Sequence, residues 1–224
     1  MSPEQPPSFP RIPRLLDGAE IGDDRVAEPG VVRELLREPV VVEEKLDGMN
    51  VAVWLDGAGW PVVAGRSGKT QGDRGGQLGR VKTWLGEHAE AVKAVIEPGG
   101  ALYGEWLGRV HSVVYDALPD WLVVLDLWTT SGGFAVVSER DRRCREAGLA
   151  TPPIVFEGRL GSLAALEGLH GVSRFGSGAA EGLVLRREVG GRLVDRVKWI
   201  APGFSQKSDS EWRGDARENR LRRG

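Results

Sequence analysis

The sequence has one cysteine, Cys144, among its 224 residues, so it cannot form an internal disulfide. This scarcity favours an intracellular, cytoplasmic setting, where thiols stay reduced. Histidine is also scarce, because the chain holds only three, and they are scattered along it. With a single cysteine they lack the close spacing that a zinc site requires. We therefore expect neither a disulfide framework nor a structural zinc ion.

An excess of charge of one sign is also missing. The 30 Lys and Arg residues nearly balance the 32 Asp and Glu residues, which leaves a formal net charge of -2. This balance argues against a protein that coats nucleic acid through bulk attraction, although a local basic cleft is compatible with it. No apolar run approaches the ~20 residues that cross a bilayer. The Pro-rich residues 1–13 lack the apolar stretch of a signal peptide, so no membrane association is expected.

Hydrophobic residues make up 41% of the chain, which suffices for one large domain or two small ones. Their pattern mixes short apolar runs with helical spacing and predicts an α+β fold with mainly antiparallel sheets. We predict strands at residues 40–44, 50–55, 60–64, 101–107, 121–128, 183–187 and 193–200. We predict helices at residues 78–96, 138–148 (opened by a Ser138/Asp141 capping box) and 162–169.

The most informative motif is Lys45-Leu46-Asp47-Gly48, which directly follows the apolar residues 40–44. A lysine at the end of a buried strand is costly when it is charged and unpaired. One interpretation is a nucleophile at the mouth of a pocket, and the alternative is an exposed lysine followed by a turn. The later Gly-Lys-Thr at residues 68–70 suggests a P-loop, but that motif needs a glycine where this chain has Val63.

Further polar residues stand where predicted strands begin or end. Asp126 is embedded in an apolar strand, where a lone carboxylate needs a partner or a function. Arg196 and Lys198 alternate along one strand and therefore share a face. The complete ordered set is Lys45, Arg66, Glu105, Asp126, Glu181, Arg196 and Lys198.

This ordered set resembles the motifs of the covalent nucleotidyltransferases, which comprise ATP-dependent DNA ligases, RNA ligases and mRNA capping enzymes. Five or six short motifs between Lys45 and Lys198 carry the resemblance. The chain is most similar to RNA ligases that seal nicked RNA, which also tend to carry an asparagine at the position of Asn50. The short stretch after Lys198 leaves no room for the OB-fold that DNA ligases place there.

The resemblance implies a nucleotidyltransferase domain at residues 36–203. Residues 1–35, rich in Pro and Asp, are expected to wrap its surface. Residues 204–224 are expected to form a short basic tail without an OB-fold. The arginines of this tail would either be solvated or lie along a phosphate backbone.

The resemblance also implies a reaction, in which Lys45 attacks the α-phosphorus of ATP and holds AMP as a phosphoramidate. The AMP would then pass to a 5′-phosphate, which a 3′-hydroxyl attacks to join two strands. Because a lysine amine is nucleophilic only when neutral, burial or nearby cations must lower its pKa. Lys198, with Arg196, would offset the charge on the α-phosphate. Glu181, with Glu105, would bind Mg²⁺ or Mn²⁺ through hard carboxylate oxygens.

Two positions depart from the family pattern. Leu125 stands where ligases usually place an aromatic residue that stacks on adenine, which leaves both ATP and GTP open. Arg196 replaces the first lysine of the last motif and keeps its charge. The full set of expected nucleotide-binding residues is Glu44 (through its backbone), Asp47, Gly48, Asn50, Arg66, Glu105, Leu125, Arg196 and Lys198.

The implied partners are nucleic acid strand ends, with RNA favoured over DNA. An end-healing enzyme or a separate substrate-binding subunit would complement a chain this short. Three alternatives stay open: a DNA ligase-like enzyme, a capping-type enzyme that uses GTP, and a nucleotide-binding module that has lost turnover.

Overall fold

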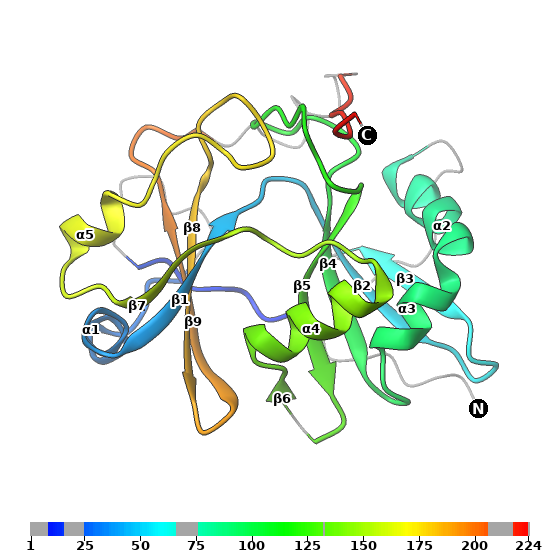
Figure 1. Ribbon diagram of the computed structural model, residues 1–224, viewed down its shortest axis with the longest axis horizontal. Coiled ribbons are helices and arrows are strands. Elements are labelled where there is room, and N and C mark those ends of the chain that lie inside the picture. The colour runs from blue at the N-terminus through cyan, green and yellow to red at the C-terminus, as the bar shows by residue number, and fades with distance from the viewer. Residues whose placement is uncertain (1–8, 16–24, 66–75, 132, 206–216, 224) are drawn as a thin grey trace.

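The computed structural model describes residues 9–15, 25–65, 76–131, 133–205 and 217–223. Two antiparallel sheets face each other, and helices cover their outer faces (Figure 1). The predicted α+β class with mainly antiparallel sheets is therefore confirmed.

The first sheet carries the Lys45 strand near its centre. Its strand order is β7-β1-β8-β9. Helices α1 and α5 pack on its outer face around Val42, Leu185 and Trp199. The element bounds are β1 (Pro39–Lys45), β7 (Ile154–Arg159), β8 (Gly182–Val189), β9 (Arg192–Ile200), α1 (Pro29–Arg37) and α5 (Leu163–Glu167).

The second sheet has the order β3-β2-β4-β5-β6. Helices α2, α3 and α4 cover its outer face, and the core between them includes Val53, Trp84 and Leu102. The strand bounds are β2 (Met49–Leu55), β3 (Pro61–Gly65), β4 (Ala101–Trp106), β5 (Leu122–Thr129) and β6 (Gly133–Phe134). The helix bounds are α2 (Gln77–Glu87), α3 (Ala89–Val95) and α4 (Val137–Ala147).

Two helix predictions were wrong in detail. The predicted helix 78–96 is broken at His88, whose ring stacks on Trp84 and whose Nδ1 lies 2.9 Å from the Trp84 carbonyl oxygen. The predicted capping box at Ser138 does not form, because α4 begins one residue earlier. A carboxylate from β8 satisfies its first turn instead, since the Val137 N–H donates to Glu188 Oε1 at 2.6 Å.

The structure also contains elements that the sequence pattern did not reveal. Strand β7 was missed because its apolar run is only three residues long, from Ile154 to Phe156, and every residue of the strand is half-buried or exposed. Strand β6 has only two residues. Helix α1 starts with Pro29, a residue that suits the first helical position because that position needs no N–H donor.

Alternation along β1 sends its apolar and charged side chains to opposite faces of the sheet. Val40 and Val42 join the core beneath α1 and α5. Glu43 and Lys45 therefore face the second sheet. The register places Val184 opposite Glu43 and Gly182 opposite Lys45. As a result, charged groups are concentrated between the two sheets.

Buried ion pairs connect the sheets and provide the partner that Asp126 was expected to need. Arg186 of β8 donates to Glu43 at 2.5 Å and to Asp126 of β5 at 2.6 Å. Arg196 of β9 also pairs with Asp126, and Arg140 of α4 pairs with Glu43. We call these five residues the buried charge network. It joins both sheets and one helix through side chains that are almost fully buried.

The segment 9–15 lies against both sheets. Its backbone pairs with β9, because Lys198 N–H donates to the Pro13 carbonyl at 2.9 Å and Leu15 N–H donates to the Lys198 carbonyl at 2.8 Å. Phe9 stacks on Tyr103 of β4 with 4.8 Å between ring centroids. Leu15 is buried. These residues of the predicted surface-wrapping segment thus contribute to the interior, while the domain boundaries stay predictions.

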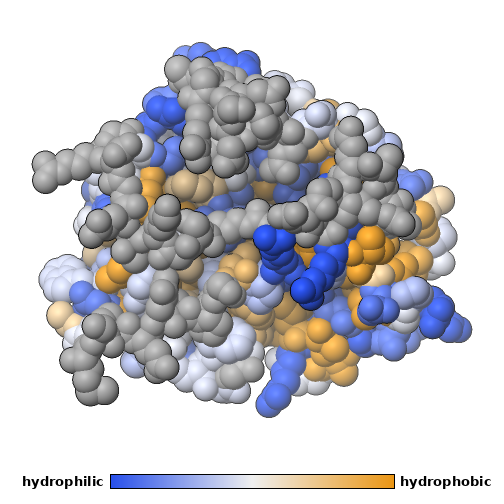
Figure 2. Space-filling model, turned by 180° about the vertical axis from the view of Figure 1, so that it is seen from behind, coloured by the Kyte–Doolittle hydropathy of each residue, from blue (hydrophilic) through white to orange (hydrophobic). Residues whose placement is uncertain are grey.

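Seen from behind, the surface mixes hydrophobic and hydrophilic side chains (Figure 2), as is normal for a folded protein. The larger exposed hydrophobic residues include Trp60, Val172, Val189 and Val194. No helix among the described residues is long and apolar enough to cross a membrane.

Replacing Asp126 with Ala tests the buried charge network. The change leaves Arg186 and Arg196 without a shared counter-charge, so the free energy of unfolding should fall by about 3–5 kcal/mol. Urea titration at pH 7 measures it. Glu90→Ala is the control, because Glu90 forms an exposed pair with Lys93, and its midpoint should stay close to wild type. Equal losses in both variants would contradict the importance of the network.

Candidate active site

Lys45 ends β1 and points into the space between the sheets. Its Nζ lies 2.6 Å from Glu181 Oε2, and their side chains are 21% and 3% exposed. The pairing follows from the register, since Lys45 lies opposite Gly182, the residue after Glu181. The structure therefore favours a half-buried, paired Lys45 over an exposed lysine before a turn.

The turn after Lys45 requires glycine. A Cβ atom at Gly48 would lie 2.5 Å from the Trp106 carbonyl oxygen, which is too close for any other residue. The Gly48 N–H donates to Glu105 Oε1 at 2.9 Å. Asn50 lies directly opposite Glu105 in the β2–β4 register. These contacts bring three predicted nucleotide-binding residues to one corner of the site.

Asp47 is held by the loop that follows β4. Its Oδ2 accepts from the N–H groups of Ser112 at 2.6 Å and Val113 at 2.9 Å. Its own N–H donates to the Tyr115 hydroxyl at 2.8 Å. Its Oδ1 is buried and has no hydrogen-bond partner among the described residues. The loop thus fixes the turn and leaves one buried carboxylate oxygen without a hydrogen bond among the described residues.

Lys198 lies on the same inner face, two residues along β9 from Ile200, which pairs with Gly182. Its positive charge contributes to lowering the pKa of Glu181. The strand register thus places Lys198 on the inner face, two residues along the paired strands from Gly182 and the Lys45 position. Lys45, Glu105, Glu181 and Lys198 therefore belong to one site.

Burial and charge set the protonation of this site. Burial acts to lower the pKa of Lys45, but the carboxylates of Glu181 and Glu105 outweigh it and raise that pKa. Burial raises the pKa of Glu105 to about 7, although Lys45 acts in the opposite direction. Burial likewise raises the pKa of Glu181. Without a ligand, the neighbouring carboxylates thus favour the charged ammonium form of Lys45.

Several predicted site residues lie elsewhere. The Glu44 side chain points to the opposite face, where it accepts from the Ser173 hydroxyl and the Arg174 N–H. Its backbone N–H donates to the Pro153 carbonyl at 2.9 Å. The Glu44 side chain therefore supports the loop at residues 171–180 and does not line the space between the sheets.

Arg196 belongs to the buried charge network, and the backbone of Leu125 contacts it. Arg196 pairs with Asp126 and lies between the rings of Phe9 and Phe134. The Leu125 carbonyl accepts from Arg140 at 2.7 Å, and its side chain is half-buried. The structure thus places Arg196 away from the Lys45–Glu181 pair. Arg66 lies outside the described residues.

The sequence pattern did not identify Tyr115 or Phe9 as part of the site. Tyr115 was predicted to lie in a loop to which no function was assigned, and only its hydrogen bond with Asp47 shows that it supports the turn after Lys45. Phe9 was placed in a surface segment, yet it supplies an aromatic ring between the sheets. Neither residue stands in a motif, so no sequence signal distinguished them.

The carboxylates near Lys45 fit a divalent ion only as partial ligands. Among the described residues, no three His, Cys, Asp or Glu side chains are close enough to hold a metal by themselves. Glu181 and Glu105 nevertheless present hard oxygens, and Mg²⁺ is commonly bound by one or two carboxylates together with substrate phosphates and water. The donor set therefore fits an ion that arrives with a nucleotide.

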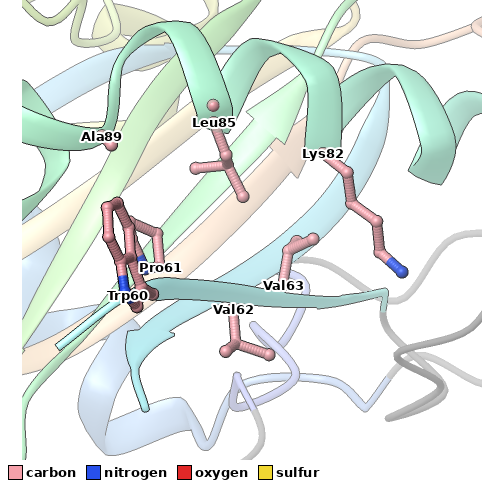
Figure 3. Close-up of a pocket in the computed structure, with 8 residues that line it drawn as sticks. Trp60, Pro61, Val62, Val63, Lys82, Leu85 and Ala89 are labelled. Carbon is pink, nitrogen blue, oxygen red and sulfur yellow. The ribbon is translucent and has the colours of Figure 1, made fainter. Parts of the chain in front are cut away.

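A hollow between β3 and α2 has a different character (Figure 3). Leu85 points from α2 toward β3, whose Val63 points back toward the helix. The lining is mostly apolar, and among the described residues it contains one charged side chain, Lys82, and no carboxylate. The lining residues are Trp60, Pro61, Val62, Val63, Lys82, Leu85, Gly86 and Ala89.

Two facing antiparallel sheets with a half-buried lysine and its carboxylate partners define a nucleotidyltransferase domain of the ligase type. Residues 38–200 match the family described as RNA ligase, and the chain belongs to that family. No curated protein sequence matches the chain at a significant level.

Solved structures of Naegleria gruberi RNA ligase share the fold. The structure with PPi has a TM-score of 0.61 and 18% identity, over 77% of this chain and 52% of that chain. A mutant with ATP and Mn has a TM-score of 0.62 and 17% identity over the same shares. An apo mutant has a TM-score of 0.62 and 17% identity, over 88% of this chain and 61% of that chain. This chain thus spans about half the length of the first two.

Replacing Glu105 with Gln tests the electrostatics of the site. Because burial raises the pKa of Glu105 from 4.5 to about 7, the folded protein holds a proton that the unfolded chain releases. The stability of the wild type should therefore fall as pH rises through this interval. The variant should show a shallower fall in urea midpoints measured between pH 4.5 and 7.5.

The exposed Glu157 of β7 provides the matched control for this substitution. Glu157→Gln should keep the wild-type pH dependence. An unchanged slope in the Glu105 variant would show that this carboxyl group does not bind the proton.

Proposed function

We propose that this protein is an ATP-dependent RNA ligase that works through a covalent lysyl-AMP at Lys45. The single observation that carries the proposal is the Lys45–Glu181 pair at 2.6 Å, held between two sheets of a ligase-type domain. A protein that only binds nucleotide has no need for a lysine in this position. Family membership across residues 38–200 supports the same chemistry.

In the first step, Lys45 Nζ would attack the α-phosphorus of ATP. The N–P bond forms as the bond from that phosphorus to the pyrophosphate oxygen breaks. Lys45 must first lose a proton, and Glu181 is the nearest acceptor because its carboxylate lies 2.6 Å away. Lys198 lies on the same face and would offset the charge that develops on the α-phosphate.

The expected metal is Mg²⁺ or Mn²⁺, held by Glu181 with Glu105. A bound divalent ion would supply positive charge beside these carboxylates and so favour the neutral amine of Lys45. Manganese is present with ATP in a related solved structure. The buried Asp47 Oδ1, which has no hydrogen-bond partner among the described residues, would be a further oxygen donor if ligand binding opens the site.

Asn50 and Glu105 lie together beside the Lys45 turn and would contact the nucleotide sugar. Leu125 would offer an aliphatic surface to the base. The backbone of Glu44 and the nucleotide-binding roles of Asp47, Gly48, Arg66 and Arg196 remain parts of the proposal. A cytoplasmic location follows from the single cysteine and is likewise proposed.

The substrates would be a 5′-phosphate end and a 3′-hydroxyl end, with RNA favoured over DNA. AMP passes from Lys45 to the 5′-phosphate, and the 3′-hydroxyl then displaces AMP and forms the phosphodiester bond. An end-healing enzyme or a separate substrate-binding subunit would act with this chain. A panel of nicked duplexes with RNA or DNA on each side of the break distinguishes these substrates.

Incubation with α-³²P-labelled ATP and Mg²⁺ tests the first step. The wild type should gain covalent label and release pyrophosphate, whereas Lys45→Ala should gain none, because the proposal assigns the attacking amine to Lys45 and only a charge-offsetting role to Lys198. Denaturing gel electrophoresis followed by autoradiography measures the label. Parallel reactions with labelled GTP test the capping-type alternative.

Lys82→Ala is the control, since Lys82 is exposed on α2 and lies outside the site. Its labelling should match the wild type. Label retained by Lys45→Ala, or an unlabelled wild type, would refute the proposal. Labelling by GTP and not by ATP would instead support the capping-type alternative.

A further inference from the structure

The segment 217–223 is anchored to the loop that follows β4. Asn219 is 2% exposed. Its amide nitrogen donates to the carbonyls of Leu107 at 2.8 Å and Arg109 at 3.0 Å. Its amide oxygen accepts from the Tyr115 N–H at 2.9 Å. One buried side chain thus holds both ends of this loop and fixes the segment upon it.

Backbone hydrogen bonds extend this anchor. The Arg220 N–H donates to the Tyr115 carbonyl, and the Leu118 N–H donates to the Arg220 carbonyl, each at 2.9 Å. The Arg222 N–H donates in turn to the Leu118 carbonyl at 2.9 Å. This part of the predicted tail therefore has a defined course along the protein surface.

The same loop reaches the nucleophile turn. Tyr115, which Asn219 contacts through its backbone, accepts from the Asp47 N–H through its hydroxyl. The segment is therefore connected to the turn after Lys45 through a single residue, Tyr115. In Figure 1 the C-terminal residues lie at the top, beside the loop after β4 and near the turn between β1 and β2.

Three arginines of this segment face solvent: Arg220, Arg222 and Arg223. None of their side chains forms an ion pair with another described residue. Two arginines of α4, Arg142 and Arg143, differ, because each is paired with a glutamate. A fixed backbone that carries three guanidinium groups without described counter-charges is suited to a polyanion.

We propose that Arg220, Arg222 and Arg223 bind the phosphate backbone of the RNA strand whose end reaches Lys45. This inference rests on the proposed function. Arginine presents a planar fork of N–H donors that matches phosphate oxygens. Asn219 holds these groups at a fixed distance from the nucleophile turn, so phosphate contacts would align the strand end with Lys45. The segment would thus serve as the substrate grip.

The test is a triple variant, R220Q/R222Q/R223Q, compared with the wild type. Binding of a fluorescein-labelled nicked RNA duplex is measured by anisotropy across a series of salt concentrations. Each lost phosphate contact lowers the slope of log affinity against log salt by about 0.7–0.9, so three contacts lower it by about 2. Strand joining should show a raised KM for RNA, while covalent labelling by ATP stays at the wild-type rate.

The control is R33Q/R37Q/R159Q, which removes the same charge from exposed positions on α1 and the end of β7, away from the C-terminal segment. It should keep the wild-type salt slope. Wild-type RNA affinity and slope in the first variant, or an equal loss in the control, would overturn the inference. Failure of the wild type to gain label would instead overturn the proposed function.

Discussion

The ion pairs of Arg186 are the constraint on which the rest of the structure depends. This side chain reaches Glu43 in its own sheet and Asp126 in the other. Because buried charges are stable only with good partners, the two sheets are held at the separation that these contacts require. Every inward-facing residue of the candidate site takes its position from that separation.

The Lys45–Glu181 pair also lies between the sheets, but its charges are balanced differently from those of the buried charge network. The buried charge network is balanced by several arginines and carboxylates, whereas Lys45 depends chiefly on the carboxylates of Glu181 and Glu105. These groups keep Lys45 charged in the absence of a ligand. The divalent ion proposed for this site would compete with Lys45 for these carboxylates, so ion binding and proton loss from the amine would be coupled through charge.

The strands could be predicted because their apolar runs and glycine turns are local properties. Lys45, Glu105 and Glu181 could be predicted as a set because their motifs occur in a family order. Residues such as Tyr115, Arg140 and Asn219 could not, because their roles arise from contacts across long sequence separations. The break at His88 was missed since the apolar spacing continues through it.

The sequence by itself determined the fold class and the candidate nucleophile. Alternating apolar and polar residues, turn residues and ordered motifs are all local features that can be recognised in short segments. The partner of each charge was decided only by the tertiary structure. Arg196 and Lys198 share one strand face, yet Arg196 pairs with Asp126 while Lys198 lies near Glu181. The physical reason is that a buried charged side chain pairs with the opposite charge that lies nearest to it in space. The register of the strands determines which charge that is.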